Sequence, residues 1–180
     1  LSGVGGDELF AGYDYFDQLR RLSRFEILWK VFPESLRQVA AAPLARSNNP
    51  VGVQKSATFL SADGSIPSLY PRMRQFLFPG QISELLEDSF TNFPVGEPAG
   101  RSQVLDAVEL PELSQISTLE MANYLHNVLL RDTDQMSMAH SLEVRVPLLD
   151  HKVVEYVLGL ADSTKTASEV PKPLLTSALS

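Results

Sequence analysis

The sequence has 180 residues, 44% hydrophobic and 21% charged, which suits one water-soluble domain with a sizeable core. Its formal net charge is −7, and this balance argues against nucleic acid as a partner, because nucleic-acid binders usually carry a basic face. The absence of Cys excludes disulfides, thiolate metal sites and a Cys nucleophile within these residues, and it is compatible with a reducing compartment.

The first stretch, LSGVGGDELFAGY, is typical of the end of a buried strand, a tight glycine turn and the start of a helix. Gly3, Gly5 and Gly6 lack a Cβ, so their backbone N–H groups can approach an anion closely, and a helix start favours phosphate. Asp7 follows where a carboxylate could hold Mg²⁺ against those phosphates. The structural alternative is a tight strand-to-helix turn with Asp7 as the cap. The stretch matches neither the Walker-type P-loop nor the GxGxxG dinucleotide fingerprint.

Helical spacing dominates the residues that follow. One helix is expected from Asp7 onward, with an apolar face made by Leu9, Phe10, Tyr13, Phe16 and Leu19. Residues 24–46 predict one or two further helices with a break at Pro33. Two more are predicted at 51–61 and 66–78, a turn at 47–52, a short helix at 81–90 and a mobile Pro- and Gly-rich loop at 91–104.

The strongest helical pattern of the chain covers residues 117–131. Ser117 and Glu120 have the spacing of a capping box at its start. Its apolar stripe is predicted to contain Leu119, Ala122, Leu125 and Val128.

The C-terminal part begins with weak strand signal at 143–146, before Pro147. Asp150 is expected to cap a helix whose inner face is Val153, Val154, Val157 and Leu158. Residues 161–170 predict a loop, and Pro171 has the place of a first-turn proline in a last helix. Because strand signal is confined to residues 1–3 and 143–146, the chain is expected to be mostly α-helical.

Residues 129–151 are rich in polar side chains threaded between Leu and Met, namely Arg131, Asp132, Asp134, Gln135, His140, Glu143 and Arg145. Charged side chains that lie among apolar ones tend to form ion pairs or to have a function. The alternative is that Glu143, Arg145 and Asp150 form ion pairs that brace helix ends. The three histidines, His126, His140 and His151, have no shared metal-binding spacing.

Lys172 stands alone just inside the predicted last helix. A lysine at such a position is normally a solvated surface residue. The alternative is a mobile cation that neutralises phosphate charge in a transition state.

Three stretches, in this order, resemble the C-terminal synthetase domain of the glutamine-hydrolysing asparagine synthetase family. They are LSGVGGDELFAGY, DQMSMAHSLEVRVPLLDH and PKPLLTSAL. The resemblance implies a mostly helical fragment of an α/β parent, with an adenine-nucleotide α-hydrolase-like parallel sheet and surrounding helices. Residues 1–180 would form the C-terminal part of that domain. The family's first nucleotide loop and its glutaminase domain would lie upstream in a longer, cytoplasmic protein.

The resemblance also implies an activity and roles for individual residues. Such domains bind ATP with Mg²⁺, activate a carboxylate as an acyl-adenylate and amidate it with ammonia from glutamine. Ser2 and Gly3 match the ATP-contacting pair, Asp7 the Mg²⁺-ligating aspartate and Lys172 the catalytic lysine. Gly5 and Gly6 would complete the phosphate loop. Implied partners are these small molecules, the N-terminal glutaminase domain and, in a homodimer, a second copy; no nucleic acid and no membrane are expected.

Two departures from the family pattern affect these expectations. The first nucleotide loop, a Ser-Gly-Gly-x-Asp-Ser pattern, is absent, so the isolated chain is expected not to turn over ATP. Val4 stands where asparagine synthetases have Glu, and Val cannot accept a proton or orient ammonia. The parent would then amidate another carboxylate or use another base. The rival readings are a non-catalytic helical binding domain and an amide-bond synthetase that uses no glutamine.

Overall fold

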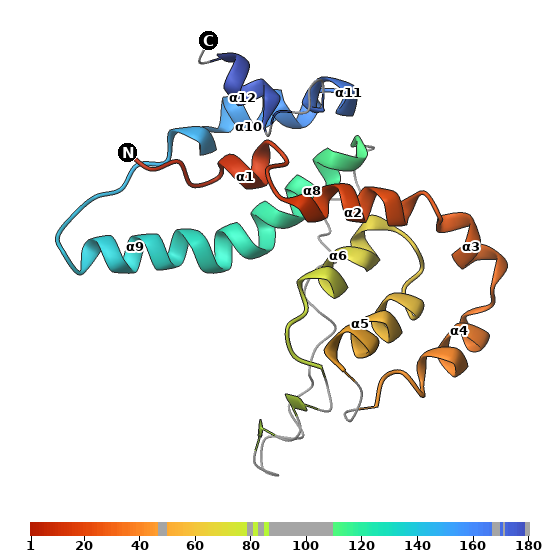
Figure 1. Ribbon diagram of the computed structural model, residues 1–180. Helices are drawn as coiled ribbons and strands as arrows, with labels where there is room; N and C mark the ends of the chain where they lie inside the picture. Colours follow the sequence, from red (N-terminus) through yellow and green to blue (C-terminus); the bar gives the residue numbers. More distant parts are fainter. Residues whose placement is uncertain are drawn as a thin grey trace. The chain divides into compact units, whose positions relative to one another are not determined.

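The computed structural model describes residues 1–46, 50–78, 81–82, 85–86, 110–166, 170 and 172–178 (Figure 1). These residues form helices, turns and extended stretches but no β-strand, which confirms the expected mostly helical chain. No helix in the described ranges is long and apolar enough to span a membrane. The chain divides into two compact units, Leu1–Gln18 with Ser102–Ser180, and Leu19–Arg101.

The first helical region is two helices, not one as predicted: α1 covers Gly6–Leu9 and α2 covers Asp14–Ser23. The helix ends after Leu9 because Ala11 adopts the left-handed conformation, with φ 54°, and the Gly12 N–H donates to the Asp7 carbonyl at 2.8 Å. The apolar face is nevertheless as predicted at four of its five positions, which are buried: Leu9, Phe10, Phe16 and Leu19.

A long continuous helical segment in the first unit joins α8 (Glu112–Glu120), η3 (Met121–Leu130) and α9 (Arg131–Met138), as Figure 1 shows. The predicted capping box is wrong, since the helix begins after Pro111 and Ser117 is buried inside α8. The predicted stripe is half right: Leu119 and Leu125 are buried, whereas Ala122 and Val128 are exposed. η3 is a π-helix, whose i→i+5 hydrogen bonds change which residues share a face.

Short elements follow α9: η4 (Pro147–Leu149), α10 (His151–Gly159), α11 (Asp162–Lys165) and α12 (Pro173–Ala178). The Asp150 carboxylate accepts a 2.9 Å hydrogen bond from the Lys152 N–H, which confirms the predicted cap. Part of the loop predicted at 161–170 is instead the helical turn α11. Pro171 lies outside the described residues, and Pro173 begins α12.

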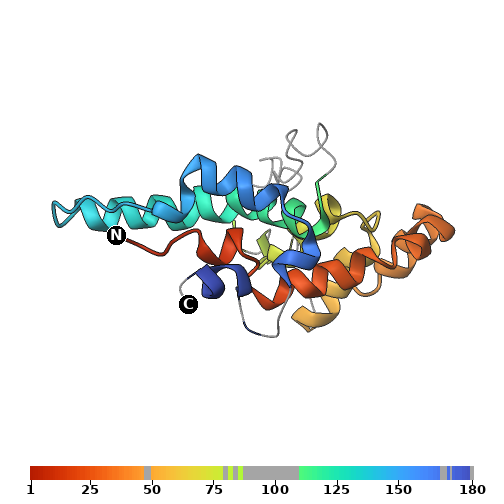
Figure 2. The ribbon, with the colours of Figure 1, turned by 90° about the horizontal axis from the view of Figure 1, so that it is seen from above.

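The core of the first unit contains Leu9 from α1, Phe10 directly after it and Val157 from α10. The predicted inner face of α10 is confirmed, because Val153, Val154 and Leu158 pack against this cluster. Figure 2 shows α10 running beside the long helical segment, and α1 contacts both. Leu148 of η4 and Leu174 of α12 also pack there, so the cluster holds the start and the end of the chain together.

The second unit contains α3 (Glu26–Val31), α4 (Glu34–Ala41), α5 (Val51–Leu60) and α6 (Ile66–Arg74). The predicted break is confirmed, since Pro33 is the N-cap of α4. α4 packs on α5 and α5 on α6. The loop predicted at 91–104, half of the turn at 47–52 and most of the helix at 81–90 lie outside the described residues.

Candidate functional site

The chain begins with an extended stretch that is held by two hydrogen bonds around Ser2. The Ser2 N–H donates to the Arg145 carbonyl at 2.9 Å, and the Ser2 hydroxyl accepts from the Val4 N–H at 3.2 Å. The two stretches that carried strand signal therefore meet here, although neither forms a strand. This bond places the first predicted motif beside the second.

Gly5 and Gly6 form the turn into α1. Gly5, with φ 93°, is the N-cap of the helix, so Asp7 is not the cap but lies in the first turn. A Cβ at Gly5 would lie 2.3 Å from Leu149 Cδ2, and one at Gly6 would lie 3.2 Å from Leu148 Cδ1. The Gly6 N–H donates to the Gly3 carbonyl at 3.1 Å. Both glycines thus allow the turn to pack closely against η4.

Asp7 and Lys172, which the sequence suggested separately, form an ion pair. The Lys172 Nζ lies 2.7 Å from the Asp7 Oδ1, and both side chains are partly exposed to solvent. Lys172 has a left-handed backbone, with φ 53°, directly before α12 begins. A cation and a carboxylate from opposite ends of the chain therefore share one solvent-accessible place beside the glycine turn.

Gly12 is a site residue that the sequence reasoning missed. A Cβ at this position would lie 2.1 Å from the Asp7 Oδ1 and 2.7 Å from the Lys172 Cε, closer than atoms can approach. In this arrangement the Asp7 carboxylate and the Lys172 stem occupy the space that a side chain at position 12 would fill. The sequence did show a glycine at the end of the first motif. It could not show that Asp7 and Lys172 would lie beside this glycine in the fold.

Glu8 and Tyr13 stabilise the same turn through a hydrogen bond on its buried side. The buried Glu8 carboxylate accepts a 2.5 Å hydrogen bond from the Tyr13 hydroxyl. Partial burial and this bond raise the pKa of Tyr13 above its ordinary value. The Tyr13 ring also stacks on Tyr15, with the ring centres 5.3 Å apart. Asp7 and Glu8 are therefore neighbours with different roles, one facing solvent and one closing the turn.

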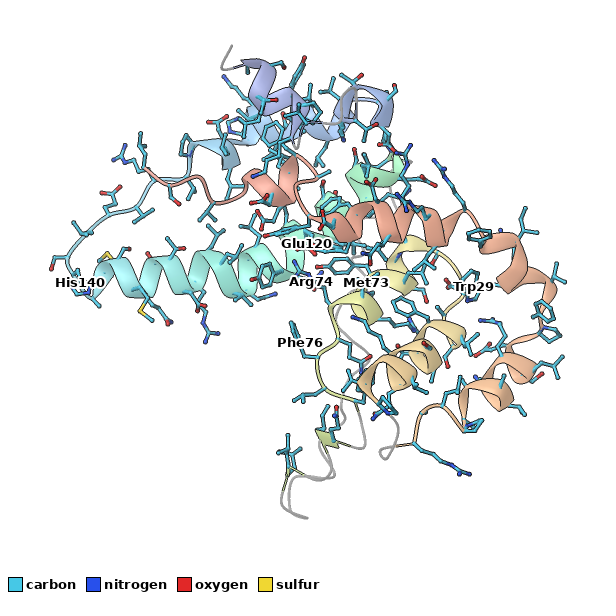
Figure 3. All side chains as sticks on the ribbon, in the orientation of Figure 1. Trp29, Met73, Arg74, Phe76, Glu120 and His140 are labelled. Carbon is cyan, nitrogen blue, oxygen red and sulfur yellow. The ribbon has the colours of Figure 1, made fainter. Side chains whose placement is uncertain are left out.

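The predicted polar cluster at 129–151 is largely exposed. Glu143 and Arg145 form an exposed ion pair at 3.1 Å, as the structural alternative predicted for these two residues. Asp150 acts mainly as the α10 cap, with His151 Nδ1 at 3.9 Å. His140 lies at the far end of the long helical segment (Figure 3). Within the described ranges, no group of three or more His, Asp or Glu could hold a metal ion.

Comparison with known proteins gives a consistent result. The asparagine synthase family matches residues 1–180. The chain is 25% identical to asparagine synthetase [glutamine-hydrolyzing] 1 of Bacillus subtilis, over 97% of this chain and 27% of that protein. It is 26% identical to a putative asparagine synthetase [glutamine-hydrolyzing] of Mycobacterium bovis, over 99% of this chain and 26% of that protein.

A relative with another name also matches: amidase chyE of Penicillium rubens is 27% identical over 92% of this chain and 26% of its own length. No solved structure matches the chain. The chain spans about a quarter of the length of these relatives. Since the family match runs from the first residue to the last, the chain belongs to the asparagine synthase family.

Proposed function

We propose that the parent protein is an ATP-dependent amidotransferase that adenylates a carboxylate and amidates it with ammonia derived from glutamine. The observation that supports this most is the contact between Asp7 and Lys172 at 2.7 Å. Two residues that the family resemblance assigns to metal binding and catalysis lie together, although they come from opposite ends of the chain. In this proposal the chain is the C-terminal part of the synthetase domain, and the sheet of an α/β parent lies upstream.

The donor set at the site fits Mg²⁺ in part. Mg²⁺ in nucleotide sites is commonly held by one or two carboxylates together with phosphate oxygens and water. Asp7 would supply one carboxylate oxygen, and the remaining ligands would come from the nucleotide, water and a residue upstream. Bound Mg-ATP would supply the activated phosphorus that the carboxylate substrate attacks.

Each candidate residue then has a defined task. The Lys172 ammonium would leave Asp7 and bind a phosphate oxygen instead. Its flexible side chain allows the ammonium to reach the phosphate on which negative charge develops in the transition state. Ser2 and Gly3 would contact the nucleotide from the extended stretch. Gly5 and Gly6 would keep the phosphate loop in place through their close packing on η4, which is a positioning role.

The acceptor is a carboxylate. Its identity depends on which group performs the role of the family glutamate, because Val4 stands at that position. Val offers no hydrogen-bonding or proton-accepting group. Aspartate is therefore one candidate, and another acid is the second. With another carboxylate, the parent would be an amide-bond synthetase of the same family. A non-catalytic binding domain is the third reading; Val4 favours it, and the Asp7–Lys172 pair opposes it.

The proposal extends to the parent's partners and location. A glutaminase domain of the same chain would deliver ammonia, a homodimer is its expected assembly, and the parent would work in the cytoplasm. The isolated 180 residues would be inactive, because the first nucleotide loop and its second Mg²⁺-binding aspartate are not among them.

The decisive experiment is ATP–pyrophosphate exchange by the full-length parent, with and without aspartate. Exchange that requires aspartate and disappears in Lys172→Ala supports asparagine synthesis. Lys152→Ala, on the exposed side of α10, is the matched control and should retain exchange. Exchange with other acids but not aspartate would identify a different acceptor. A folded parent that fails to bind Mg-ATP by calorimetry would contradict the proposal and favour the binding domain.

A further inference from the structure

Asp7, the carboxylate of the candidate site, lies on a helix that is too short to hold its own shape. α1 covers only Gly6–Leu9, and a single turn of helix is unfavourable in isolation, because few hydrogen bonds offset the ordering of its backbone. The start of α1 is held by the close packing of Gly5 and Gly6 against η4. The position of the Asp7 carboxylate therefore also depends on what holds the end of this helix.

The core anchors the backbone on both sides of the ion pair. α1 and α12 lie beside each other (Figure 1) and share one apolar cluster, which includes Phe10, Leu174 and Leu175. Lys172 directly precedes α12, so its backbone is tied to this cluster. Ala11 and Gly12, which follow Phe10, have little side chain to pack. The path of the chain between α1 and α2 therefore depends on its hydrogen bonds.

Two hydrogen bonds close this turn, one made by the backbone and one by side chains. The Gly12 N–H donates to the Asp7 carbonyl at 2.8 Å, across the left-handed Ala11. The Tyr13 hydroxyl donates to the Glu8 Oε1 at 2.5 Å. Each partner of the second bond directly follows a partner of the first in the chain. The bond between Tyr13 and Glu8 therefore restrains the same backbone that carries Asp7.

Both partners of the side-chain bond are themselves held by packing. The Glu8 side chain is buried, with 2% of the residue exposed. The Tyr13 ring stacks on Tyr15, with the ring centres 5.3 Å apart, and its centre lies 6.3 Å from that of Phe16. Phe16 is buried in the first turn of α2. The bond thus ties a buried carboxylate of α1 to a packed aromatic group at the start of α2.

Gly12 lies directly against both side chains of the ion pair. A Cβ at this position would collide with the Asp7 Oδ1 and would lie 2.7 Å from the Lys172 Cε. The backbone here is therefore one wall of the place where the carboxylate meets the lysine side chain. Closely packed atoms transmit small displacements to their neighbours. Because Tyr13 is the next residue, its bond to Glu8 restrains the position of this wall.

We propose that Tyr13, through its bond to Glu8, is a positioning residue that sets where the Asp7 carboxylate lies relative to the Lys172 ammonium. A hydrogen bond suits this task because it is directional. An apolar pair of the same shape would avoid the desolvation of a buried carboxylate but would fix the geometry less closely. The positional part of the inference stands on the geometry of this turn, and its consequence for Mg-ATP binding rests on the proposed function.

Cross-linking of the full-length parent with a water-soluble carbodiimide measures this position directly. The reagent converts the Asp7 carboxylate into an O-acylisourea; the Lys172 Nζ attacks its acyl carbon and loses a proton, an amide forms and the urea leaves. Peptide mass spectrometry gives the yield of the Asp7–Lys172 amide. Tyr13→Phe should lower this yield several-fold. Glu8→Gln, which keeps a carbonyl acceptor for Tyr13, should retain most of it, and Tyr156→Phe, at an exposed tyrosine of α10, should match the wild type.

The double variant Glu8→Leu with Tyr13→Phe separates positioning from stability. Replacing both polar partners by apolar groups of similar shape should leave the midpoint of urea unfolding near that of the wild type. The yield of the Asp7–Lys172 amide should nevertheless stay low, because the directional bond is gone. This variant also carries the comparison if Tyr13→Phe does not fold. An unchanged yield in Tyr13→Phe, or full recovery of the yield in the double variant, would overturn the inference.

Calorimetry of Mg-ATP binding to the full-length parent tests the consequence for the site. Tyr13→Phe and the double variant should each bind about tenfold more weakly than the wild type, as is common when an outer partner of a metal ligand is lost. Equal affinity of the wild type and the double variant would overturn the positioning role. Failure of the wild type to bind Mg-ATP would contradict the proposed function, and the cross-linking yields would still decide whether Tyr13 positions Asp7.

Discussion

Gly12 leaves room for the two charged residues of the candidate site. Its backbone N–H binds the Asp7 carbonyl, and its missing side chain leaves room for the Asp7 carboxylate and the Lys172 stem. Gly5 has a different reason to be glycine, since its φ of 93° is strained for other residues and Leu149 fills the space where a Cβ would lie. Glycines of one short motif therefore serve distinct steric needs.

Replacing Gly12 by Ala should separate Asp7 from Lys172 and destabilise the protein. Overpacking of this kind costs about 1–3 kcal/mol, and the collision involves the Asp7 backbone as well as two side chains. Gly52→Ala is the matched control, because a Cβ there meets nothing within 4 Å in α5 and should stabilise by about 0.5–1 kcal/mol. Urea unfolding of both variants measures the difference. Equal stability of the two would show that the turn relaxes and that Gly12 is not required.

Tyr13 is expected to make the stability of the fold depend on pH in the alkaline range. Its pKa is raised in the folded protein by burial and by the Glu8 hydrogen bond, so the unfolded chain loses this proton first. The stabilisation is complete below about pH 10, the ordinary pKa of tyrosine, and is lost as the pH rises toward the raised value. Tyr13→Phe should cost about 1–3 kcal/mol near neutrality, because Glu8 stays buried without this donor.

Urea unfolding of the wild type and Tyr13→Phe between neutral and strongly alkaline pH gives the comparison. The stability difference between them should shrink as the unfolded tyrosine ionises. Tyr156→Phe, at an exposed tyrosine of α10, should follow the wild type throughout. A constant difference at all pH values would contradict the raised pKa.

At the scale of elements, the short helix α11 stabilises the beginning of the long helical segment. The Asp162 carboxylate accepts from the Leu113 N–H at 3.3 Å, one of the first N–H groups of α8. The buried Lys165 ammonium donates to the Ser114 hydroxyl, which itself donates to the Leu158 carbonyl at 2.7 Å. α8, α10 and α11 are thus joined through Ser114 and through Asp162 and Lys165, two residues that the sequence assigned to a loop.

The buried charge of Lys165 is expected to lower the stability of the folded state. Burial lowers its pKa, and the nearby Asp162 opposes this only in part. Lys165→Met should therefore raise the free energy of unfolding at neutral pH by about 1 kcal/mol, because it removes a charge that is desolvated on folding. Between the lowered pKa and the ordinary value near 10.4, the unfolded state binds more protons, so wild-type stability should rise with pH there.

The test is urea unfolding of the wild type, Lys165→Met and the exposed-site control Lys152→Met over neutral to alkaline pH. Lys165→Met should lack the rise in stability that the wild type and the control share. A marked loss of stability in Lys165→Met would instead show that the hydrogen bond to Ser114 outweighs the desolvation of the ammonium.

For the whole molecule, burial differs strongly between individual helices. α8 in the first unit contributes six buried residues, including Leu113, Ile116 and Leu119. In the second unit α4 contributes Ala41 alone, and Ile27 and Val31 of α3 are exposed. Helices with few buried apolar residues open at lower free energy than well-packed ones. α3 and α4 are therefore expected to open at lower free energy than α8.

Native-state hydrogen exchange should resolve this difference. Backbone amides of α8 are expected to exchange about 100-fold more slowly than those of α3 and α4 under the same conditions. Uniform protection of all these helices would show that the two units open together.

The sequence by itself determined the local features of this protein. Periodicity predicted helices at 51–61 and 66–78, which the structure has at Val51–Leu60 and, ending earlier than predicted, at Ile66–Arg74. Pro33 predicted the break before α4, and Asp150 predicted the α10 cap. Each depends on residues within one or two turns of each other. The three motifs also sufficed to indicate the family, because their residue types and order could be read without knowing any contact.

The tertiary structure decided the features that need distant segments. The end of α1 at Leu9 and the π-helical hydrogen bonding of η3 depart from what local periodicity predicted. The meeting of Asp7 with Lys172, and the space at Gly12 that permits it, required the core that packs α1, α10 and α12 together. Local spacing carries no information about which residues become neighbours across a fold, since that depends on how apolar faces from separate elements cover one another.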